Sequence, residues 1–340
     1  MPRIPDEALE SVVYLYPSEA AAEDGEQIGG TGFLIGIPIP YIQNAPAHLR
    51  CVVTNAHIVD AGSMVVRANT TDGAMTTIPL DGAEWFRHPE GDDIAICPIG
   101  LDNQRHKYKL IHPNMFLRKE IIAMLDIGPG DDVFIVGRFI NREGKQKNMP
   151  SVRFGNIAQM PGDPLILEGG KEQECFLVEG RSIPGFSGAP VFVQIIPEPP
   201  NFPEFPPDLK QYEPKPPTNR PKMTFKAGPF LMGIDFCHLF NKDRVISDET
   251  GRPTNDWHVR SNTGMMGVIP MWRIMDVIDN PKMKKLRDQL EQDVKKIRTS
   301  QVNLDTAGEV PPPANAVNPK HREDFNSLLD AAVKKPEQED

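Results

Sequence analysis

Short apolar runs rich in Val, Ile and Phe recur along the chain, and Gly, Pro and Asp separate them. In chain order they include TGFLIGI, CVVTNA, DIAICPI, DDVFIVGRF, SVRFGNIAQ, CFLVEG, APVFVQII, PFLMGIDFC and GMMGVIP. Apolar runs of this length, bounded by turn residues and evenly spaced, are typical of strands in an all-β barrel or sandwich. About ten such strands need more than one sheet. The pattern therefore predicts an all-β fold rather than alternating β and α units.

Two regions break this pattern. Residues 197–221 hold ten prolines in 25 positions, which excludes regular strand or helix and favours an extended, polyproline-like insertion. After Pro270, apolar residues follow helical spacing at 271, 274, 275 and 278, and a second candidate helix lies near 283–299. The chain ends in polar sequence with one apolar stripe at 325–333, too short to be stable alone in water. We expect a C-terminal helix followed by a partly helical or disordered tail.

Composition and charge narrow the function classes. With 340 residues, 39% of them hydrophobic, the chain can bury one sizeable core or two small ones. A formal net charge of −10 argues against nucleic acid or an anionic membrane as partner, because both need clustered Lys and Arg. The sequence shows neither an apolar run of about 18 residues nor a secretory signal pattern. We therefore expect a soluble, cytoplasmic protein.

The four cysteines, Cys51, Cys97, Cys175 and Cys237, are far apart and form no Cys-x-x-Cys pair. Zinc sites need closely spaced Cys and His ligands, so we expect no metal. Each cysteine lies in an apolar run, which favours reduced, buried thiols and a reducing compartment.

The stretch RSIPGFSGAPVFV, residues 181–193, places Ser187 between two glycines just before a strand. Glycine is used where the backbone must bend sharply or approach a ligand closely. A serine hydroxyl becomes a nucleophile only with a base beside it and donors aimed at the developing oxyanion. The motif therefore requires a histidine and an acid elsewhere in the chain.

His57 and Asp93 are the candidates for these partners. His57 ends the apolar run CVVTNAHIV, where a strand gives way to a turn, whereas most of the other histidines lie in polar surroundings. Taken alone, such a residue is ordinarily interpreted as a core histidine whose hydrogen bonds are made within the protein. HPEGDDIAICPIG offers two adjacent acids, Asp92 and Asp93, and Asp93 directly precedes the apolar run. The predicted order is His57, Asp93, Ser187.

A rival interpretation is the nucleophile elbow of an α/β-hydrolase, Gly-x-Ser-x-Gly, which GFSGA almost spells. That elbow needs a helix after the serine, and its acid and histidine come later in the chain. Ser187 is followed by the β-branched, apolar run APVFVQII, which has no helical stripe. The elbow is therefore excluded by its context.

Seven blocks together resemble a known superfamily: GTGFLIG, VVTNAHIV, DDIAI, GDDVFIVGRF, SVRFGNIA, PGFSGAPV and GMMGVIP. Their order and rough intervals are similar to those of chymotrypsin-like serine proteases, and they look most like bacterial trypsin-like, HtrA-type peptidase domains. The resemblance covers about residues 10–280, without the Pro-rich insertion. It implies two six-stranded antiparallel β-barrels: an N-terminal barrel over 1–110 and a C-terminal barrel over 111–282. Residues 283–340 form the charged tail, too short for a PDZ domain.

The resemblance also implies a catalytic triad. Ser187 would be the nucleophile, His57 the general base and acid, and Asp93 the residue that fixes the imidazole tautomer. The backbone N–H groups of Gly185 and Ser187 would form the oxyanion hole. We therefore expect a serine-type endopeptidase, a hydrolase that needs no cofactor.

The sequence departs from the family beside the serine and in the specificity pocket. Chymotrypsin-type enzymes carry an acid just before the serine, which pairs with a new N-terminus after activation; here that residue is Phe186. A preformed site is expected instead, or one ordered by oligomerisation or ligand. The candidate pocket residues are Arg181, Asp235, Phe236 and Gly267. Arg181 either prefers an acidic substrate side chain or forms a structural ion pair, and Phe236 replaces a serine that supports the triad acid in many relatives.

A second function from another class stays open: a non-catalytic peptide-binding or scaffold protein on the same fold. It would act through the Pro-rich segment at 197–221 and the tail at 283–340. Either segment is also a candidate for a protein partner or for self-association, with a plain solvated insertion or fraying tail as the alternative.

Overall fold

The computed structural model describes residues 4–26, 29–39, 48–139, 147–167, 170–180, 185–194, 229–248 and 252–305. The Pro-rich insertion predicted at 197–221 and the apolar stripe at 325–333 lie outside these ranges.

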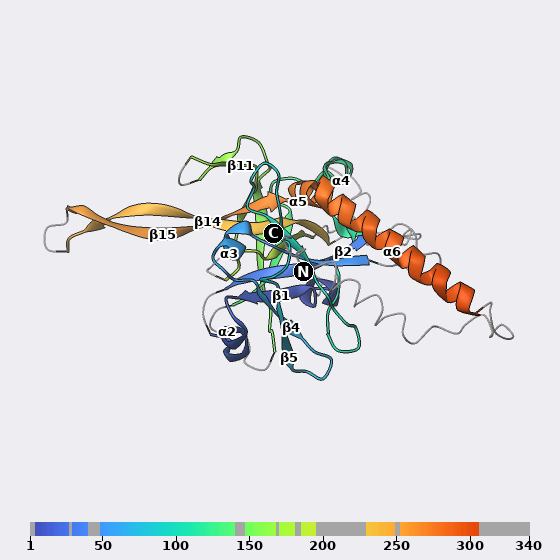
Figure 1. Ribbon diagram of the computed structural model, residues 1–340. Coiled ribbons are helices and arrows are strands. Elements are labelled where there is room, and N and C mark those ends of the chain that lie inside the picture. Colours follow the sequence, from blue (N-terminus) through green and yellow to red (C-terminus); the bar gives the residue numbers. More distant parts are fainter. Residues whose placement is uncertain are drawn as a thin grey trace, which may run out of the picture.

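Residues 12–98 form an antiparallel sheet of seven strands, in the order β5-β4-β1-β2-β3-β7-β6 (Figure 1). Its strands are β1 (Val12–Tyr16), β2 (Gly30–Pro38), β3 (His48–Thr54), β4 (Val65–Asn69), β5 (Met75–Pro79), β6 (Phe86–Arg87) and β7 (Ala95–Pro98). Three short helices accompany them: α1 (Asp6–Leu9), α2 (Glu19–Asp24) and α3 (Ala56–Asp60). We call this part the first-half sheet.

The second half of the chain contains a closed barrel of six strands in the order β12-β15-β14-β13-β8-β9. These strands are β8 (Asp132–Gly137), β9 (Ser151–Gln159), β12 (Phe176–Glu179), β13 (Pro190–Val193), β14 (Phe230–Ile246) and β15 (Pro253–Pro270). Between β9 and β12 lies a small hairpin of β10 (Leu165–Ile166) and β11 (Glu172–Gln173). The 3₁₀ turn η1 (Pro113–Met115) and helix α4 (Lys119–Leu125) connect the first-half sheet to the barrel.

The predicted all-β class is confirmed, and each of the nine apolar runs contains a strand. In the first half, the strand pairing gives a sheet of seven strands rather than six. The two-residue strand β6 pairs with β7 and forms the edge of the sheet as its seventh strand, with Phe86 opposite Ile96.

Buried apolar side chains join the two halves in a shared core. Phe33 and Phe86 from the first-half sheet belong to the same cluster as Phe134 and Phe192 from the barrel. Each fully buried side chain of this size stabilises the fold by about 1.5–3 kcal/mol. The shared core therefore fixes the two halves against each other and defines the position of any residues at their junction.

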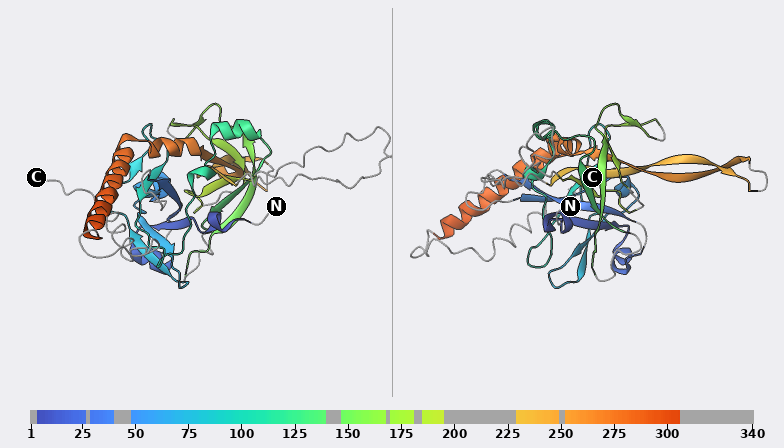
Figure 2. Two further views of the ribbon diagram at one scale, coloured as in Figure 1. Left: turned by 90° about the vertical axis from the view of Figure 1, so that its right-hand side faces the viewer. Right: turned by 180° about the vertical axis from the view of Figure 1, so that it is seen from behind.

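Two helices follow the barrel. Helix α5 (Met271–Ile278) buries Met271, Ile274 and Ile278, so the predicted helical stripe is confirmed. Helix α6 (Pro281–Asp305) lies beside the first-half sheet (Figure 2) and adds Met283 and Leu290 to the shared core. None of the helices in the described part of the chain is long and apolar enough to cross a lipid bilayer.

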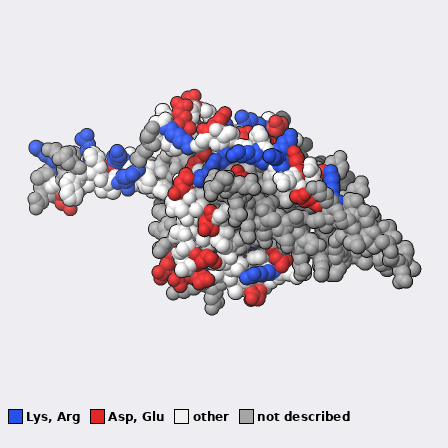
Figure 3. All heavy atoms as spheres, in the orientation of Figure 1, with Lys and Arg blue, Asp and Glu red and all other residues white. Residues whose placement is uncertain are grey.

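Strands β14 and β15 continue beyond the barrel as a twisted two-stranded ribbon that projects from the body (Figures 1 and 2). Across the ribbon, Lys242 lies opposite Arg260 and Arg244 opposite His258. Trp257 near its tip is 73% exposed. Figure 3 shows basic side chains along this ribbon, whereas acidic side chains gather over the end of the molecule that carries α2.

Candidate active site

His57 and Asp93 form a hydrogen-bonded pair where the first-half sheet ends. Strand β3 ends at Thr54, and the chain enters α3, which places His57 in the first turn of the helix. The Nδ1 atom of His57 lies 2.6 Å from Oδ2 of Asp93, and the backbone N–H of His57 donates to Oδ1 at 2.8 Å. Because one carboxylate accepts from both the backbone and the ring of His57, Nδ1 is the protonated nitrogen. In the neutral form of the ring, Nε2 is then the acceptor.

The structure separates the two adjacent acids. Asp93 receives a second fixing contact at its backbone, where Asn55 Nδ2 donates to its carbonyl oxygen at 2.9 Å. Asp92 is 6% exposed and its carboxylate faces Arg273 of α5. Of these two acids, Asp93 is therefore the one that contacts His57.

Thr31 of β2 connects the serine loop, residues 185–188, to the first-half sheet. Its N–H donates to the Ser187 carbonyl at 2.9 Å, and its hydroxyl donates to the Gly185 carbonyl at 2.6 Å. The Thr54 hydroxyl in turn donates to the Thr31 carbonyl at 2.8 Å. Because Thr54 is three residues before His57, this chain of buried hydrogen bonds brings the serine loop and the histidine turn to the same part of the junction.

The serine hydroxyl and the imidazole are not hydrogen-bonded to each other in the part of the chain that the structure describes. Contacts between a nucleophile and its base are often long in a ligand-free site and shorten when substrate binds. The structure therefore brings His57 and Asp93 into contact and places Ser187 at the same junction.

The serine loop is anchored by an apolar side chain. Phe186 is fully buried, and a Cβ on Gly137 would lie only 2.6 Å from its ring atom Cδ1. The guanidinium of Arg153 lies 5.3 Å from the Phe186 ring centroid. Burial of this ring among apolar side chains of the barrel anchors the serine loop.

The backbone of the serine loop is bent at glycine residues. Gly185 has φ 95°, a conformation that favours glycine. The N–H groups of Gly188 and Ala189 are bonded to the carbonyls of Asp235 (2.9 Å) and Phe186 (2.7 Å). The N–H of Ser187 donates no hydrogen bond among the described residues, so it is free to bind a ligand oxygen.

Replacing Gly188 with alanine is expected to destabilise the protein by about 2–4 kcal/mol, from positive-φ strain and overpacking together. Gly188 has φ 84°, and an added Cβ would lie 1.9 Å from the Thr31 carbonyl oxygen. Urea unfolding measures the loss. The matched control is Gly73→Ala, with φ 88° and open space around its Cβ, which isolates the cost of the backbone angle. Equal losses in the two variants would show that contact with Thr31 is unimportant.

The predicted specificity residues occupy different surroundings. Arg181 lies outside the described residues. The Phe236 ring lies on Gly267, since a Cβ there would be 2.5 Å from its Cε1 atom. Asp235 is 1% exposed, and its N–H donates to the Ala189 carbonyl at 3.0 Å. The pocket assignment therefore stays a prediction.

All four cysteines are free, and burial makes them poor nucleophiles. Burial raises the pKa of the Cys175 thiol to about 11 and that of the Cys237 thiol to about 12. Burial also raises the pKa values of the Cys51 and Cys97 thiols. These thiols stay protonated near neutral pH and do not compete with Ser187. Over the described ranges, no group of three or more His, Cys, Asp or Glu side chains is placed to hold a metal ion.

Sequence reasoning missed several residues that position the site: Asn55, Thr31, Thr54 and Arg87. Arg87 donates to the Ala56 carbonyl at 3.0 Å and so holds the turn that carries His57. Thr31 and Thr54 are fully buried polar residues inside apolar strands. Buried polar groups need hydrogen-bond partners. A threonine inside each of these apolar runs was therefore the feature of the sequence that could have indicated these contacts.

The structure thus packs a first-half antiparallel sheet on a closed six-stranded barrel and places a His–Asp pair and a glycine-flanked serine at their junction. This arrangement leaves open which reaction the chain performs.

No family model matches the chain, and no curated protein matches its sequence. Among solved structures, the apo MamO protease domain from Magnetospirillum magneticum is 15% identical, with a TM-score of 0.44 over 79% of this chain and 96% of that one. The Rv3671c protease of M. tuberculosis, in an inactive form, is 15% identical, with a TM-score of 0.39 over 80% and 88%. The HtrA-type protease AlgW with a decapeptide is 14% identical, with a TM-score of 0.39 over 81% and 66%.

At these identities and TM-scores, the likeness does not place the chain in a family. It assigns no role to any residue of this chain.

Proposed function

We propose that this chain is a serine endopeptidase that hydrolyses peptide bonds through an acyl-enzyme on Ser187. His57 is the base, Asp93 orients it, and the N–H groups of Ser187 and Gly185 bind the oxyanion. The substrate is a protein or peptide, and the chemistry needs no cofactor.

The observation that carries the proposal is the two-point contact between Asp93 and His57. One carboxylate oxygen accepts from the backbone N–H and the other from ring Nδ1, at 2.8 and 2.6 Å. This arrangement keeps Nδ1 protonated and leaves Nε2 as the acceptor, as a general base requires. The His57 side chain is 51% exposed, so substrate and water can reach it.

The chemistry follows from these groups. Ser187 Oγ attacks the peptide carbonyl while His57 Nε2 takes the hydroxyl proton, and the resulting oxyanion is bound by the loop N–H groups. His57 then gives the proton to the leaving amine, and the C–N bond breaks to leave an ester on Ser187. Water attacks the ester, His57 takes a proton from it, and that proton returns to Ser187 Oγ as the acid leaves. Each good oxyanion donor lowers the barrier by roughly 3–4 kcal/mol.

A serine-directed fluorophosphonate is expected to label the full chain at one site. Ser187 should carry the adduct, because its hydroxyl is the one with a base and an oxyanion donor beside it. Mass spectrometry of the digested, labelled protein locates the modified residue. A heat-unfolded sample is the control, since the reaction depends on the assembled site.

Failure to label well-folded protein rejects the endopeptidase and favours the non-catalytic peptide-binding alternative. An adduct on another serine rejects the assignment of Ser187.

A further inference from the structure

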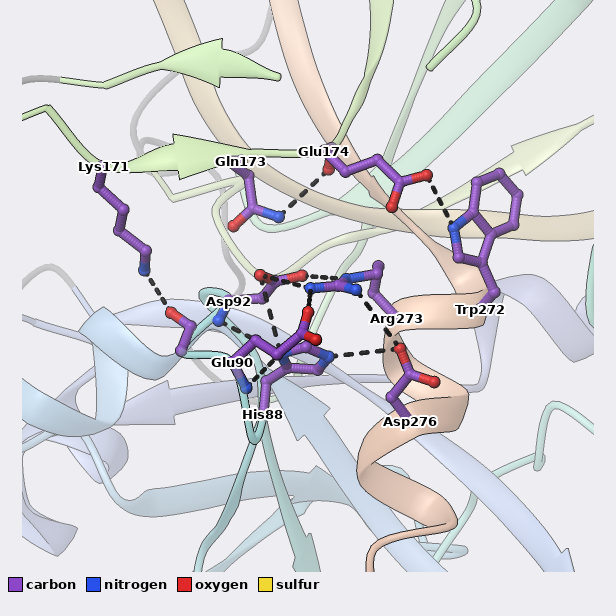
Figure 4. A network of polar contacts seen from close by, with 10 residues as sticks. His88, Glu90, Asp92, Lys171, Gln173, Glu174, Trp272, Arg273 and Asp276 are labelled. Atoms are coloured by element: carbon purple, nitrogen blue, oxygen red, sulfur yellow. Dashed lines mark hydrogen bonds and ion pairs between the residues drawn. The ribbon is translucent and has the colours of Figure 1, made fainter. Parts of the chain in front are cut away.

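The loop that leads directly into Asp93, residues 88–92, is held by Arg273 of α5 (Figure 4). Arg273 Nε donates to Asp92 Oδ2 at 2.5 Å, and its Nη2 donates to Asp92 Oδ1 at 3.1 Å. The same Nη2 atom donates to Glu90 Oε2 at 2.6 Å. Two parallel bonds between guanidinium and carboxylate fix direction as well as distance. A helix that follows the barrel thus sets the position of a loop of the first-half sheet.

His88 connects the 88–92 loop to α5 by a second route. Its side chain is fully buried, and its Nδ1 accepts from the N–H groups of Glu90 (3.3 Å) and Asp92 (3.4 Å). An accepting Nδ1 makes Nε2 the protonated nitrogen. Nε2 lies 3.4 Å from Asp276 Oδ2 on α5. The backbone of the loop is therefore tied to the same helix that carries Arg273.

The region around β11 supports the loop and the helix together. Lys171 Nζ donates to the Gly91 carbonyl of the loop. The Trp272 indole, next to Arg273, donates to Glu174 Oε1 at 3.1 Å. Figure 4 shows these contacts arranged around the Asp92–Arg273 pair. The loop, α5 and the β11 region thus form one connected polar network.

Arg273 is the cation at the centre of three carboxylates: those of Glu90, Asp92 and, at 3.7 Å, Asp276. Burial by itself raises the pKa of the Asp92 carboxyl, but hydrogen bonds from Arg273 and Gln173 outweigh it and leave that pKa below its ordinary value. Asp92 is therefore a charged group that is 6% exposed. Without Arg273, that charge would be buried without adequate compensation and the loop would have to move.

A single peptide bond joins the 88–92 loop to Asp93, so movement of the loop also moves this residue of the candidate site. Asp92 and Asp93 are consecutive, and their carboxylates face different partners, Arg273 and His57. A displacement at Asp92 therefore turns the Asp93 carboxylate relative to the imidazole. Misplacement of a catalytic group by about 1 Å can cost about 100-fold in rate.

We propose that Arg273 is a positioning residue for Asp93: by binding Asp92 and Glu90, it holds the 88–92 loop so that the Asp93 carboxylate meets both the ring and the backbone of His57. This inference rests on the proposed function of the His57–Asp93 pair and extends it to α5, a helix that lies 181 residues from Asp92 in the sequence.

Arg273→Gln in the full chain is expected to lower kcat about 10- to 100-fold, with KM within about twofold, because orientation rather than substrate binding is lost. Arg273→Lys restores part of kcat, since it keeps the charge but not the bidentate geometry. The matched control is Arg287→Gln on α6, whose side chain is 20% exposed against 18% for Arg273 and pairs with Asp279 at 3.7 Å. We expect the control to keep the wild-type kcat.

A second readout does not depend on turnover. The Nδ1 proton of His57 gives an NMR signal that His57→Ala identifies by its loss. Arg273→Gln is expected to shift or broaden this signal, and Arg287→Gln to leave it in place. If the wild-type protein hydrolyses no peptide but Arg273→Gln shifts the signal, the positioning role stands and the proposed function falls.

Glu90→Gln covers the case in which Arg273→Gln does not fold. Glu90 is 71% exposed, so its substitution leaves the core untouched. We expect kcat to fall about threefold, in line with the loss of one exposed ion pair, together with a smaller shift of the His57 signal. A folded Glu90→Gln or Arg273→Gln protein with wild-type kcat and an unshifted signal overturns the proposal.

Discussion

Ser187→Ala is expected to lower kcat for peptide hydrolysis about 10⁶-fold while the protein stays folded. The hydroxyl is the atom that forms the ester in the proposed reaction, and its removal leaves only binding and oxyanion stabilisation. The backbone contacts of the serine loop do not involve this hydroxyl: the Ser187 carbonyl accepts from Thr31, and Phe186 anchors the loop in the barrel. The loss should therefore be purely catalytic.

Initial rates on a peptide library, with the wild-type protein as reference, measure this loss. The matched control is Ser261→Ala in the ribbon, where the hydroxyl contacts Asp243 rather than the serine loop. A thermal unfolding midpoint equal to that of the wild type confirms that Ser187→Ala is folded. Hydrolysis that survives in Ser187→Ala contradicts an acyl-enzyme on this residue.

Asp93→Asn is expected to lower kcat about 10⁴-fold, a smaller loss than that of Ser187→Ala. The structure explains why the amide cannot imitate the acid. The backbone N–H of His57 needs an oxygen acceptor, at present Oδ1 at 2.8 Å, so the asparagine oxygen is drawn to that position. Its NH₂ group then faces Nδ1, which must become an acceptor. Nε2 is consequently protonated and can no longer take the serine proton.

The same peptide assay measures this effect, and fluorophosphonate labelling adds a second measurement. Asp93→Asn should still be labelled at Ser187, but slowly, whereas Ser187→Ala should not be labelled there. Asp81→Asn, an exposed acid in a turn of the first-half sheet, is the control and should keep the wild-type rate. A wild-type rate in Asp93→Asn would show that the imidazole is oriented by another group.

Much of the β architecture was readable from the spacing of apolar runs, because a half-buried or fully buried strand leaves a short apolar signature. The outer parts of β14 and β15 have no such apolar signature. Their residues are largely polar and exposed, and they are strands because they pair with each other, for example Asn241 with Ser261. Cross-strand hydrogen bonding of this kind satisfies the backbone without an apolar face, so no periodicity reveals it.

The sequence indicated the candidate residues of the site, but not the residues that hold them in position. The position of His57 at the end of an apolar run and of Asp93 at the start of another pointed to the pair. Thr31 meets Gly185 across 154 positions of sequence, and Arg273 meets Asp92 across 181. Contacts over such separations depend on how the two halves pack, and the sequence pattern of either segment alone carries no trace of them.

The basic residues of the ribbon bear on how the protein behaves at high concentration. Beyond the barrel, β14 and β15 pair with each other, and in the described part of the chain their outer edges join no further ladder. Open strand edges invite edge-to-edge aggregation, which natural proteins resist by placing charges there. Because Lys242 faces Arg260, the ribbon carries like charge on one pair of facing positions and gives up some cross-strand stability. Repulsion between the same basic residues on two ribbons opposes pairing of their open edges.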